Sequence, residues 1–457
     1  MIGYRIALAM AATLPALVSA RMVQHGRLVN QLPLAPEERS ALAKSSAGAA
    51  AHYWPHPTGI RTCAALLVDF SDSPAEYTTA EVDSVLNQPG YSRYGNKGSV
   101  RDFYLDFTRG KLDLHYKVFG YYRAAKTKTY YENVGNYAGG DELMDEVIKA
   151  FNATVDYTAF GTAGESAINS IAILYAGQEH DGDLWGTTTW SDAKVDGRTA
   201  GRGYWASIGH GTMEIATFSH EMGHMLFDWP DLYNVPKAAG GVDAHSLMGS
   251  YADVHNPIPP DETLQADQGW IDVVDLAAAS NGLFPAIANA DKVYRLTNPA
   301  HADESFYVVN RKNTARWGSL DGRGMLIFHF DMAWNESNNQ NQAAVTLVQD
   351  LGAIKPPSNW AEPGWYFYKT NMPEFSYAKQ AAWNDWHAGG RSGIRLHSIS
   401  ALADTMTFSM GDISVGLGEK RKGAPGAQSA AAGAHSAVAG ASKGLGRFFV
   451  NGSLRRL

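Results

Sequence analysis

The sequence predicts an α/β (α+β) domain followed by an all-β, sandwich-like domain and a disordered C-terminal tail. Over residues 60–284, buried-strand patterns alternate with amphipathic helices, which is typical of mixed α/β domains. Over residues 285–412, short runs rich in β-branched and aromatic residues are broken by Gly, Pro, Asn and Asp, as in antiparallel sandwiches. Residues 413–457 are rich in Ala, Gly and Ser and cannot bury enough apolar surface to become ordered.

The chain begins with the features of a secretory signal peptide. Arg5 precedes an apolar run at 6–18, and small residues follow at a possible cleavage site. The run is shorter than the roughly 20 residues that a membrane span requires, and no later stretch is apolar enough to be one. We therefore expect residues 1–20 to be a signal peptide and 21–59 to be a leader or short pro-segment. The mature protein is expected to be secreted and extracellular, without a membrane span.

Charge and cysteine content limit the classes to which the protein can belong. The net charge is −8, but residues 413–457 carry +6, so that the preceding part carries −14. An acidic body argues against nucleic acid as a partner, because contacts to phosphate require a basic face. Cys63 is the single cysteine, which excludes an intrachain disulfide, and its apolar surroundings in the sequence predict a buried thiol.

Hydrophobic periodicity places the elements of the first domain. The run "CAALLVDF" is short and continuously apolar, which predicts a buried strand. Ser99 has the character of a helix N-cap, apolar residues then recur on one face, and Gly110 ends the pattern. In chain order we expect a strand at 63–70, a helix from Ser99 to Gly110, a strand from Leu112 onward, a helix at 141–151 and a strand at 170–177.

Seven short runs mark the second domain. Each has the length and the residue types of a strand, and turn residues separate them. Their regular recurrence predicts a sandwich or barrel of antiparallel strands. The runs are "KVYRLTN", "SFYVVNR", "GMLIFHFD", "AAVTLVQD", "GWYFYKT", "GIRLHSIS" and "TMTFSM".

A zinc-binding motif occurs on a further predicted helix, "TMEIATFSHEMGHMLF". His220 and His224 are four residues apart and therefore lie on one side of the helix, one turn apart. Two histidine nitrogens placed in this way can bind one zinc ion. Glu221 lies beside them, where its carboxylate could accept a proton from a water at the metal. The motif therefore predicts Zn²⁺ as cofactor, with His220 and His224 as ligands and Glu221 as the catalytic residue.

A turn-rich segment, "QEHDGDLWGTTTWSD", precedes this helix. It contains three spaced carboxylates, those of Glu179, Asp181 and Asp183. Spaced carboxylates of a loop can bind Ca²⁺, so a calcium site is one interpretation. The favoured interpretation is that these three carboxylates are solvated turn residues.

Several segments occur in an order that resembles a known family. They are "RTCAALLVDFSD", "SVRDFYLDFTRGKLDLHYKVFGYY", "HEMGHMLFDWPDLY", "SLMGS", "NPIPPDETLQADQGW", "SFYVVNRKNTARWGSLDGRGMLIFHFD" and "VTLVQD". Together they resemble the immune inhibitor A type of secreted zinc metallopeptidase, one of the metzincins, over roughly residues 60–410. The resemblance implies a zincin-like catalytic domain at 60–284 and the β-rich domain after it. It also implies that Met248 forms an apolar floor under the metal.

The third zinc ligand departs from the metzincin pattern. In that pattern it stands ten residues after the first histidine, and this position is Pro230 here. Asp231, one residue further on, is the preferred candidate, because a tightened or bulged turn would bring it to the metal. An Asp after Pro can instead cap a turn through its own backbone. The remaining candidates are Asp228 and, in a glutamate-zincin-like arrangement, Glu262 or Asp267.

The predicted function is that of a zinc-dependent endopeptidase, expected to be a monomer, that hydrolyses protein or peptide substrates with Glu221 as general base. Tyr251 is a candidate donor to the oxyanion or a packing residue, and His245 either supports the site or belongs to an unrelated turn. The alternative is a secreted binding or adhesion protein whose zincin fold no longer hydrolyses anything. The residue at position 230 favours this alternative, whereas the intact H-E-x-x-H argues against it.

Overall fold

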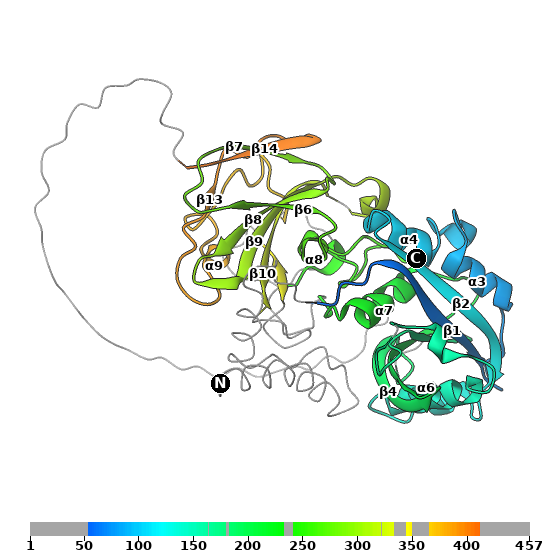
Figure 1. Ribbon diagram of the computed structural model, residues 1–457. Coiled ribbons are helices and arrows are strands. Elements are labelled where there is room, and N and C mark those ends of the chain that lie inside the picture. The colour runs from blue at the N-terminus through cyan, green and yellow to red at the C-terminus, as the bar shows by residue number, and fades with distance from the viewer. Residues whose placement is uncertain are drawn as a thin grey trace, which may run out of the picture. The chain divides into compact units, whose positions relative to one another are not determined.

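The computed structural model describes residues 54–411 except 163, 180–181, 233–240, 321, 333–343 and 350–364. The predicted signal peptide, most of the predicted leader and the predicted tail from residue 413 lie outside the described residues. The described chain is a mixed α/β structure with several sheets (Figure 1). In it, no helix has the length and apolar character needed to cross a membrane.

The first sheet has five strands in the order β2-β1-β3-β5-β4. Four of them are parallel to their neighbours, and β4 runs antiparallel to β5 at one edge. The last seven residues of β1 are all buried, because helices cover both faces of the sheet. The strands are β1 (Gly59–Asp69), β2 (Leu112–Arg123), β3 (Ile171–Tyr175), β4 (Thr187–Val195) and β5 (Arg198–Ser207).

The helices of this half divide between the two faces of the sheet. Apolar residues of α3, α4 and α7 share one hydrophobic cluster with Cys63 on β1, whereas those of α6 belong to a second cluster with Ala64. Because successive residues of a strand point to opposite faces, the two clusters lie on opposite sides of β1. The helices are α3 (Thr79–Asn87), α4 (Val100–Phe107), α5 (Lys128–Glu132), α6 (Ala138–Phe151), α7 (Ala216–Phe227) and α8 (Glu262–Asp267).

The predictions for these elements are confirmed in most cases. Ser99 caps α4 through a capping box with Asp102, as the sequence predicted for the start of this helix. Strands β1, β2 and β3 and helix α6 occupy the predicted positions, and Cys63 is buried. The segment predicted to be turn-rich departs from the prediction in its second part. Its described turn residues end at Gly186, and Thr187 begins the edge strand β4. The β-branched threonines that follow suit a sheet, which explains the difference.

The second half contains a five-stranded sheet in the order β11-β10-β9-β8-β6 and two smaller, two-stranded sheets. The large sheet consists of β6 (Asp272–Leu276), β8 (Lys292–Asn298), β9 (His301–Arg311), β10 (Gly324–Asp331) and β11 (Val345–Leu347). In the small sheets, β7 (Gly282–Ile287) pairs with β14 (Thr405–Met410), and β12 (Phe375–Ser376) pairs with β13 (Arg395–Leu396). A short helix, α9, spans Ala381–Asn384.

One strand of the large sheet departs from the predicted organisation. β6 precedes residue 285, where the β-rich domain was expected to begin, yet it joins the large sheet and runs parallel to β8. A parallel pair requires a crossover connection, and here the crossover contains β7, which leaves to pair with β14. The sequence could not reveal this, because the local pattern of β6 does not specify its partner.

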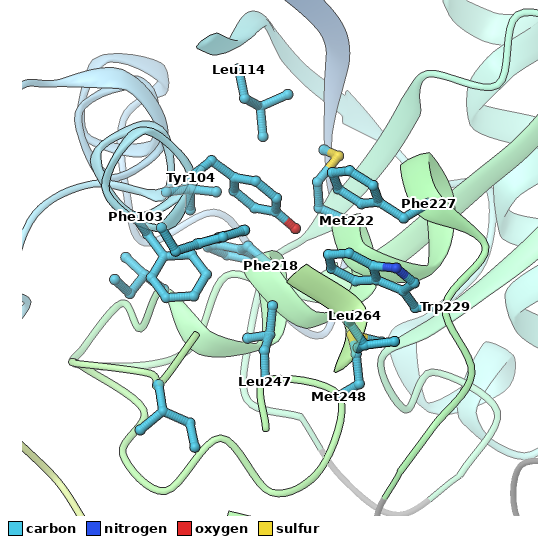
Figure 2. Close-up of a cluster of buried hydrophobic side chains, with 14 of the residues drawn as sticks. Phe103, Tyr104, Leu114, Phe218, Met222, Phe227, Trp229, Leu247, Met248 and Leu264 are labelled. Atoms are coloured by element: carbon cyan, nitrogen blue, oxygen red, sulfur yellow. The ribbon is translucent and has the colours of Figure 1, made fainter. Parts of the chain in front are cut away.

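The large sheet contributes to two hydrophobic cores. Phe306 and Val308 of β9 pack with β7, β12 and β14, whereas Tyr307 and Val309 belong to the same cluster as α4 and α7. The alternation follows from the two-residue period of a strand. Figure 2 shows part of the shared cluster, including Phe218 and Met222 of α7. The β-rich half is therefore packed into the apolar core that supports α7.

Candidate metal centre

Helix α7 presents His220 and His224 side by side. Its apolar residues Phe218, Met222 and Met225 are buried, and the Tyr104 hydroxyl donates a hydrogen bond of 2.8 Å to the Ser219 carbonyl, which ties α4 to α7. The two histidine Nε2 atoms lie 3.1 Å apart. The rings are almost perpendicular, with an interplanar angle of 84° and centroids 4.7 Å apart. The two Nε2 atoms are therefore close enough to bind one ion together.

Asp231 completes a group of three ligand atoms. Its Oδ1 lies 3.0 Å from Nε2 of His220 and 3.0 Å from Nε2 of His224. The backbone around it is fixed, because the amide of Leu232 donates a hydrogen bond of 2.6 Å to the Met248 carbonyl. Of the four carboxylates considered from the sequence, the structure brings Asp231 to the histidines.

The turn after α7 explains why this residue stands eleven rather than ten positions after His220. In the metzincin motif H-E-x-x-H-x-x-G-x-x-H, a glycine follows seven residues after the first histidine and the third ligand three residues later. Here the left-handed residue is Asp228, with a φ of 59°, eight residues after His220. Asp tolerates this conformation better than most residues other than glycine. Asp231 stands three residues after this left-handed residue, which is the separation between the glycine and the third ligand in that motif.

The three other carboxylates have different partners. Asp228 forms an ion pair of 2.8 Å with Arg202. Glu262 receives two hydrogen bonds from Arg311, of 3.0 and 2.5 Å. Asp267 lies 3.3 Å from His56. None of these three belongs to the group formed with His220 and His224 in the described chain.

Backbone carbonyls orient both imidazoles. Nδ1 of His220 lies 2.9 Å from the Leu247 carbonyl, and Nδ1 of His224 lies 2.5 Å from the Trp229 carbonyl. Because a carbonyl can only accept, each Nδ1 carries the proton in the neutral ring and each Nε2 presents its lone pair to the shared point. This is the tautomer that a metal-binding histidine requires.

The donor set fits a divalent cation such as Zn²⁺. Two imidazole nitrogens and one carboxylate oxygen, with an open position, are typical of catalytic zinc sites. The buried Asp231 carboxylate also needs a positive partner: burial opposes its ionisation, but His224 and His220 hold its pKa well below the usual range. Burial lowers the pKa of His224, yet Asp231 outweighs it and raises the pKa to about 9. Without metal, a proton thus supplies the positive charge that the site demands.

Glu221 lies beside this group in a cavity of about 490 Å³. The hydroxyl of Thr188, on the edge strand β4, donates a hydrogen bond of 3.0 Å to its Oε2 and fixes the carboxylate. Burial raises the pKa of Glu221, while His224 and His220 oppose the increase. The cavity is lined by Tyr137, Glu179, Trp185, Gly186, Thr187, Thr188, Thr217, His220, Glu221, His224, Asp231, Asp243, Gly249, Ser250 and Tyr251.

Met248 and Tyr251 occupy different places around the site. Met248 is fully buried against Gly223 of the H-E-x-x-H motif, and a Cβ on Gly223 would lie only 2.6 Å from its Sδ. Tyr251 lines the cavity, with its ring centroid 6.0 Å from that of His220. His245 is not among the described residues that line the cavity. It is buried, its carbonyl accepts a hydrogen bond of 2.9 Å from Arg311, and burial followed by the charge of Arg311 lowers its pKa.

A second group of potential ligands, Glu304, His329 and His387, lies in the β-rich half. Its geometry differs from that of the first group, because the rings of His329 and His387 are stacked, with centroids 3.9 Å apart and an interplanar angle of 30°. A metal lies in the plane of each imidazole that binds it, so stacked rings are a less favourable arrangement for a shared ion than the nearly perpendicular rings of His220 and His224. Glu304 instead accepts hydrogen bonds from His329 Nε2 and Asn298 Nδ2, both of 2.8 Å.

The segment for which a calcium site was considered has its described carboxylates on backbone amides. Glu179 accepts a hydrogen bond of 2.7 Å from Gly186, and Asp183 accepts hydrogen bonds of 2.7 and 2.9 Å from Gly135 and Gly139. Asp181 lies outside the described residues. These bonds are those of residues that shape turns.

The sequence did not predict that Thr188, Glu179 and Asp243 line the same cavity as Glu221. Thr188 approaches through the β4–β5 hairpin, and Asp243 belongs to a short 3₁₀ turn (Asp243–His245), so no spacing motif connects them with α7. No protein-family model and no curated protein matches the chain.

Proposed function

We propose that the protein is a secreted zinc-dependent endopeptidase of the immune inhibitor A type, with Glu221 as general base. The observation that carries the proposal is the placement of the Glu221 carboxylate in one cavity with the three converging atoms of His220, His224 and Asp231. When bound, zinc would polarise the scissile carbonyl and lower the pKa of a water molecule.

The residues of the chain have separate roles in peptide hydrolysis. Glu221 accepts the proton of the attacking water and then delivers it to the leaving amine. Thr188 holds one carboxylate oxygen, Oε2, through its hydrogen bond, and we assign the proton transfer to the other, Oε1. The burial of Glu221 supports this role, because a raised pKa brings a carboxylate closer to the proton affinity that a general base needs near neutral pH.

The edge strand β4 offers a place for an extended substrate. It is bonded to β5 on one side and, among the strands that the structure describes, is terminal in the sheet order, so its other side has no strand partner there. Its first residues, Thr187 and Thr188, line the cavity together with Gly186. A peptide that added itself to this edge would run past Glu221, and main-chain hydrogen bonds would hold it there.

The proposal is tested with the secreted wild-type protein and Glu221→Gln, compared for casein digestion after the zinc content of each has been measured. We expect both proteins to bind zinc and only the wild type to digest casein. If neither digests casein although zinc is bound, a binding or adhesion protein with a zincin-like site becomes the better account. Equal digestion by both would refute the role of Glu221.

A further inference from the structure

Two carboxylates of the cavity have no part in the proposed hydrolysis. Glu179 and Asp243 line the cavity together with Glu221 and Asp231, and no lysine or arginine is among the described residues that line it. We propose that Glu179 and Asp243 recognise a cationic group of the substrate, the ammonium or guanidinium of a residue next to the scissile bond. The inference rests on the proposed peptidase function and names its substrate class.

Glu179 is close to the reacting region. A Cβ placed on Gly186 would lie 3.1 Å from Oε1 of Glu179 and 3.6 Å from Oε1 of Glu221, so both oxygens approach the same point on the wall of the cavity. Glu179 is half-buried and is held by its hydrogen bond from the Gly186 amide. A substrate group that touches Glu179 is therefore within one residue of the bond on which Glu221 acts.

Asp243 supplies the independent observation. The residue is 1% exposed and, among the described residues, its Oδ2 has no hydrogen-bond partner, although Ser250 contacts its carboxyl group. The backbone of Asp243 is fixed beside the cavity, because its carbonyl accepts a hydrogen bond of 3.0 Å from the Ser250 amide. Burial of a carboxylate oxygen without a hydrogen-bond partner costs folding free energy, and buried polar atoms in folded proteins normally have such a partner. A cationic group of a ligand would supply it.

The charges around the cavity support the same conclusion. Burial raises the pKa of Glu179 and the hydrogen bond from the Gly186 amide opposes the increase, while the neighbouring Glu221 and Glu214 raise the pKa further and Lys128 lowers it. Lys128 itself is paired with Glu132. A cationic substrate group next to Glu179 relieves the repulsion between this carboxylate and its acidic neighbours, whereas an anionic substrate group increases the repulsion. Substrates with Asp or Glu next to the scissile bond should therefore be disfavoured.

Two kinds of substrate could carry the cation: a peptide with an internal Lys or Arg, or a short peptide with a free α-amino group. The edge of β4, which has no strand partner in the described part of the chain, favours the internal residue, because an extended chain can continue past the site in both directions. Paired fluorogenic peptides distinguish them. One pair is blocked at both ends and contains either Arg or its neutral analogue citrulline at the residue before or after the scissile bond. The second pair has a neutral sequence with a free or an acetylated N-terminus.

The test measures kcat/KM for these peptides with the zinc-loaded wild type, Glu179→Gln and Asp243→Asn. Asp272→Asn, which removes an exposed carboxylate of β6, is the matched control. We expect the wild type to prefer Arg over citrulline by about 30-fold or more, as for a buried charge pair. The preference should shrink at least about fivefold in one or both cavity variants and stay unchanged in Asp272→Asn.

The outcomes separate this inference from the function on which it rests. Cleavage of all peptides without preference for Arg or for a free N-terminus would overturn the inference and leave the peptidase function intact. A preference that survives both substitutions in folded protein, checked by thermal unfolding, would also overturn it. A preference for the free N-terminus alone would retain the cationic class and assign it to the α-amino group. Absence of cleavage of every peptide and of casein would remove both proposals.

Discussion

Replacing Asp243 by Asn should change how the stability of the protein depends on pH. Burial raises the pKa of Asp243 from 3.8 to about 6, although a contact with Ser250 opposes the increase. Between these two pH values the folded protein keeps a proton that the unfolded chain releases. Stability therefore falls as pH rises through this window, and the loss persists above pH 6. Asn has no such proton and should not show it.

The magnitude follows from the size of the pKa change. A tenfold change in proton affinity corresponds to about 1.4 kcal/mol, so the charged Asp243 costs at most about 3 kcal/mol above pH 6. Asn also suits the left-handed backbone at this position, where φ is 41°. We expect the free energy of unfolding of Asp243→Asn, relative to that of the wild type, to rise by about 1–3 kcal/mol from pH 4 to pH 7.

The assay is urea unfolding of both proteins at pH 4, 5, 6 and 7 with the same chelator present, followed by tryptophan fluorescence. The difference in the free energy of unfolding between variant and wild type is the quantity of interest, because effects of pH on all other groups cancel in it. A difference that stays constant from pH 4 to pH 7, or that moves in favour of the wild type, would show that the ionised Asp243 carboxylate is not destabilised by burial without a cationic partner.

Three further substitutions test the site and its support. Asp231→Asn should weaken zinc binding at least about 100-fold, whereas Asp267→Asn should leave it unchanged; equal zinc affinities in a competition titration would reject Asp231 as ligand. Arg311→Met leaves Glu262 buried without its partner and should lower the free energy of unfolding, measured with a chemical denaturant, by about 3–5 kcal/mol. The double variant Arg311→Met/Glu262→Gln should recover part of this loss. Gly223→Ala crowds the Met248 sulfur and should lower the free energy of unfolding by about 1 kcal/mol; a stabilised variant would contradict the close contact.

Local patterns were sufficient for the elements that place the histidines. The buried run of β1, the Ser99 cap of α4 and the four-residue spacing on α7 are all specified within a few residues, and the structure contains each of them. The proximity of His220 and His224 then follows from the helical period alone. For this reason the part of the site that α7 supplies could be predicted from the sequence.

The rest of the site depends on contacts between distant segments. Asp231 reaches the histidines only because the helix continues to Phe227 and turns at Asp228, and the sequence alone left four candidates for the third ligand. Thr188 and Asp243 arrive from a hairpin and a short 3₁₀ turn whose positions are set by packing. The parallel pairing of β6 with β8 is likewise determined by the path of the chain between them.

The measurement that tests the central claim most directly is a zinc titration of metal-free protein during casein hydrolysis. The proposed site predicts that activity rises with added zinc and reaches its limit at one zinc per chain, and that Glu221→Gln stays inactive while binding the same amount of zinc. Activity that is independent of zinc, or that is the same in Glu221→Gln and wild type, would contradict a zinc peptidase with Glu221 as its base.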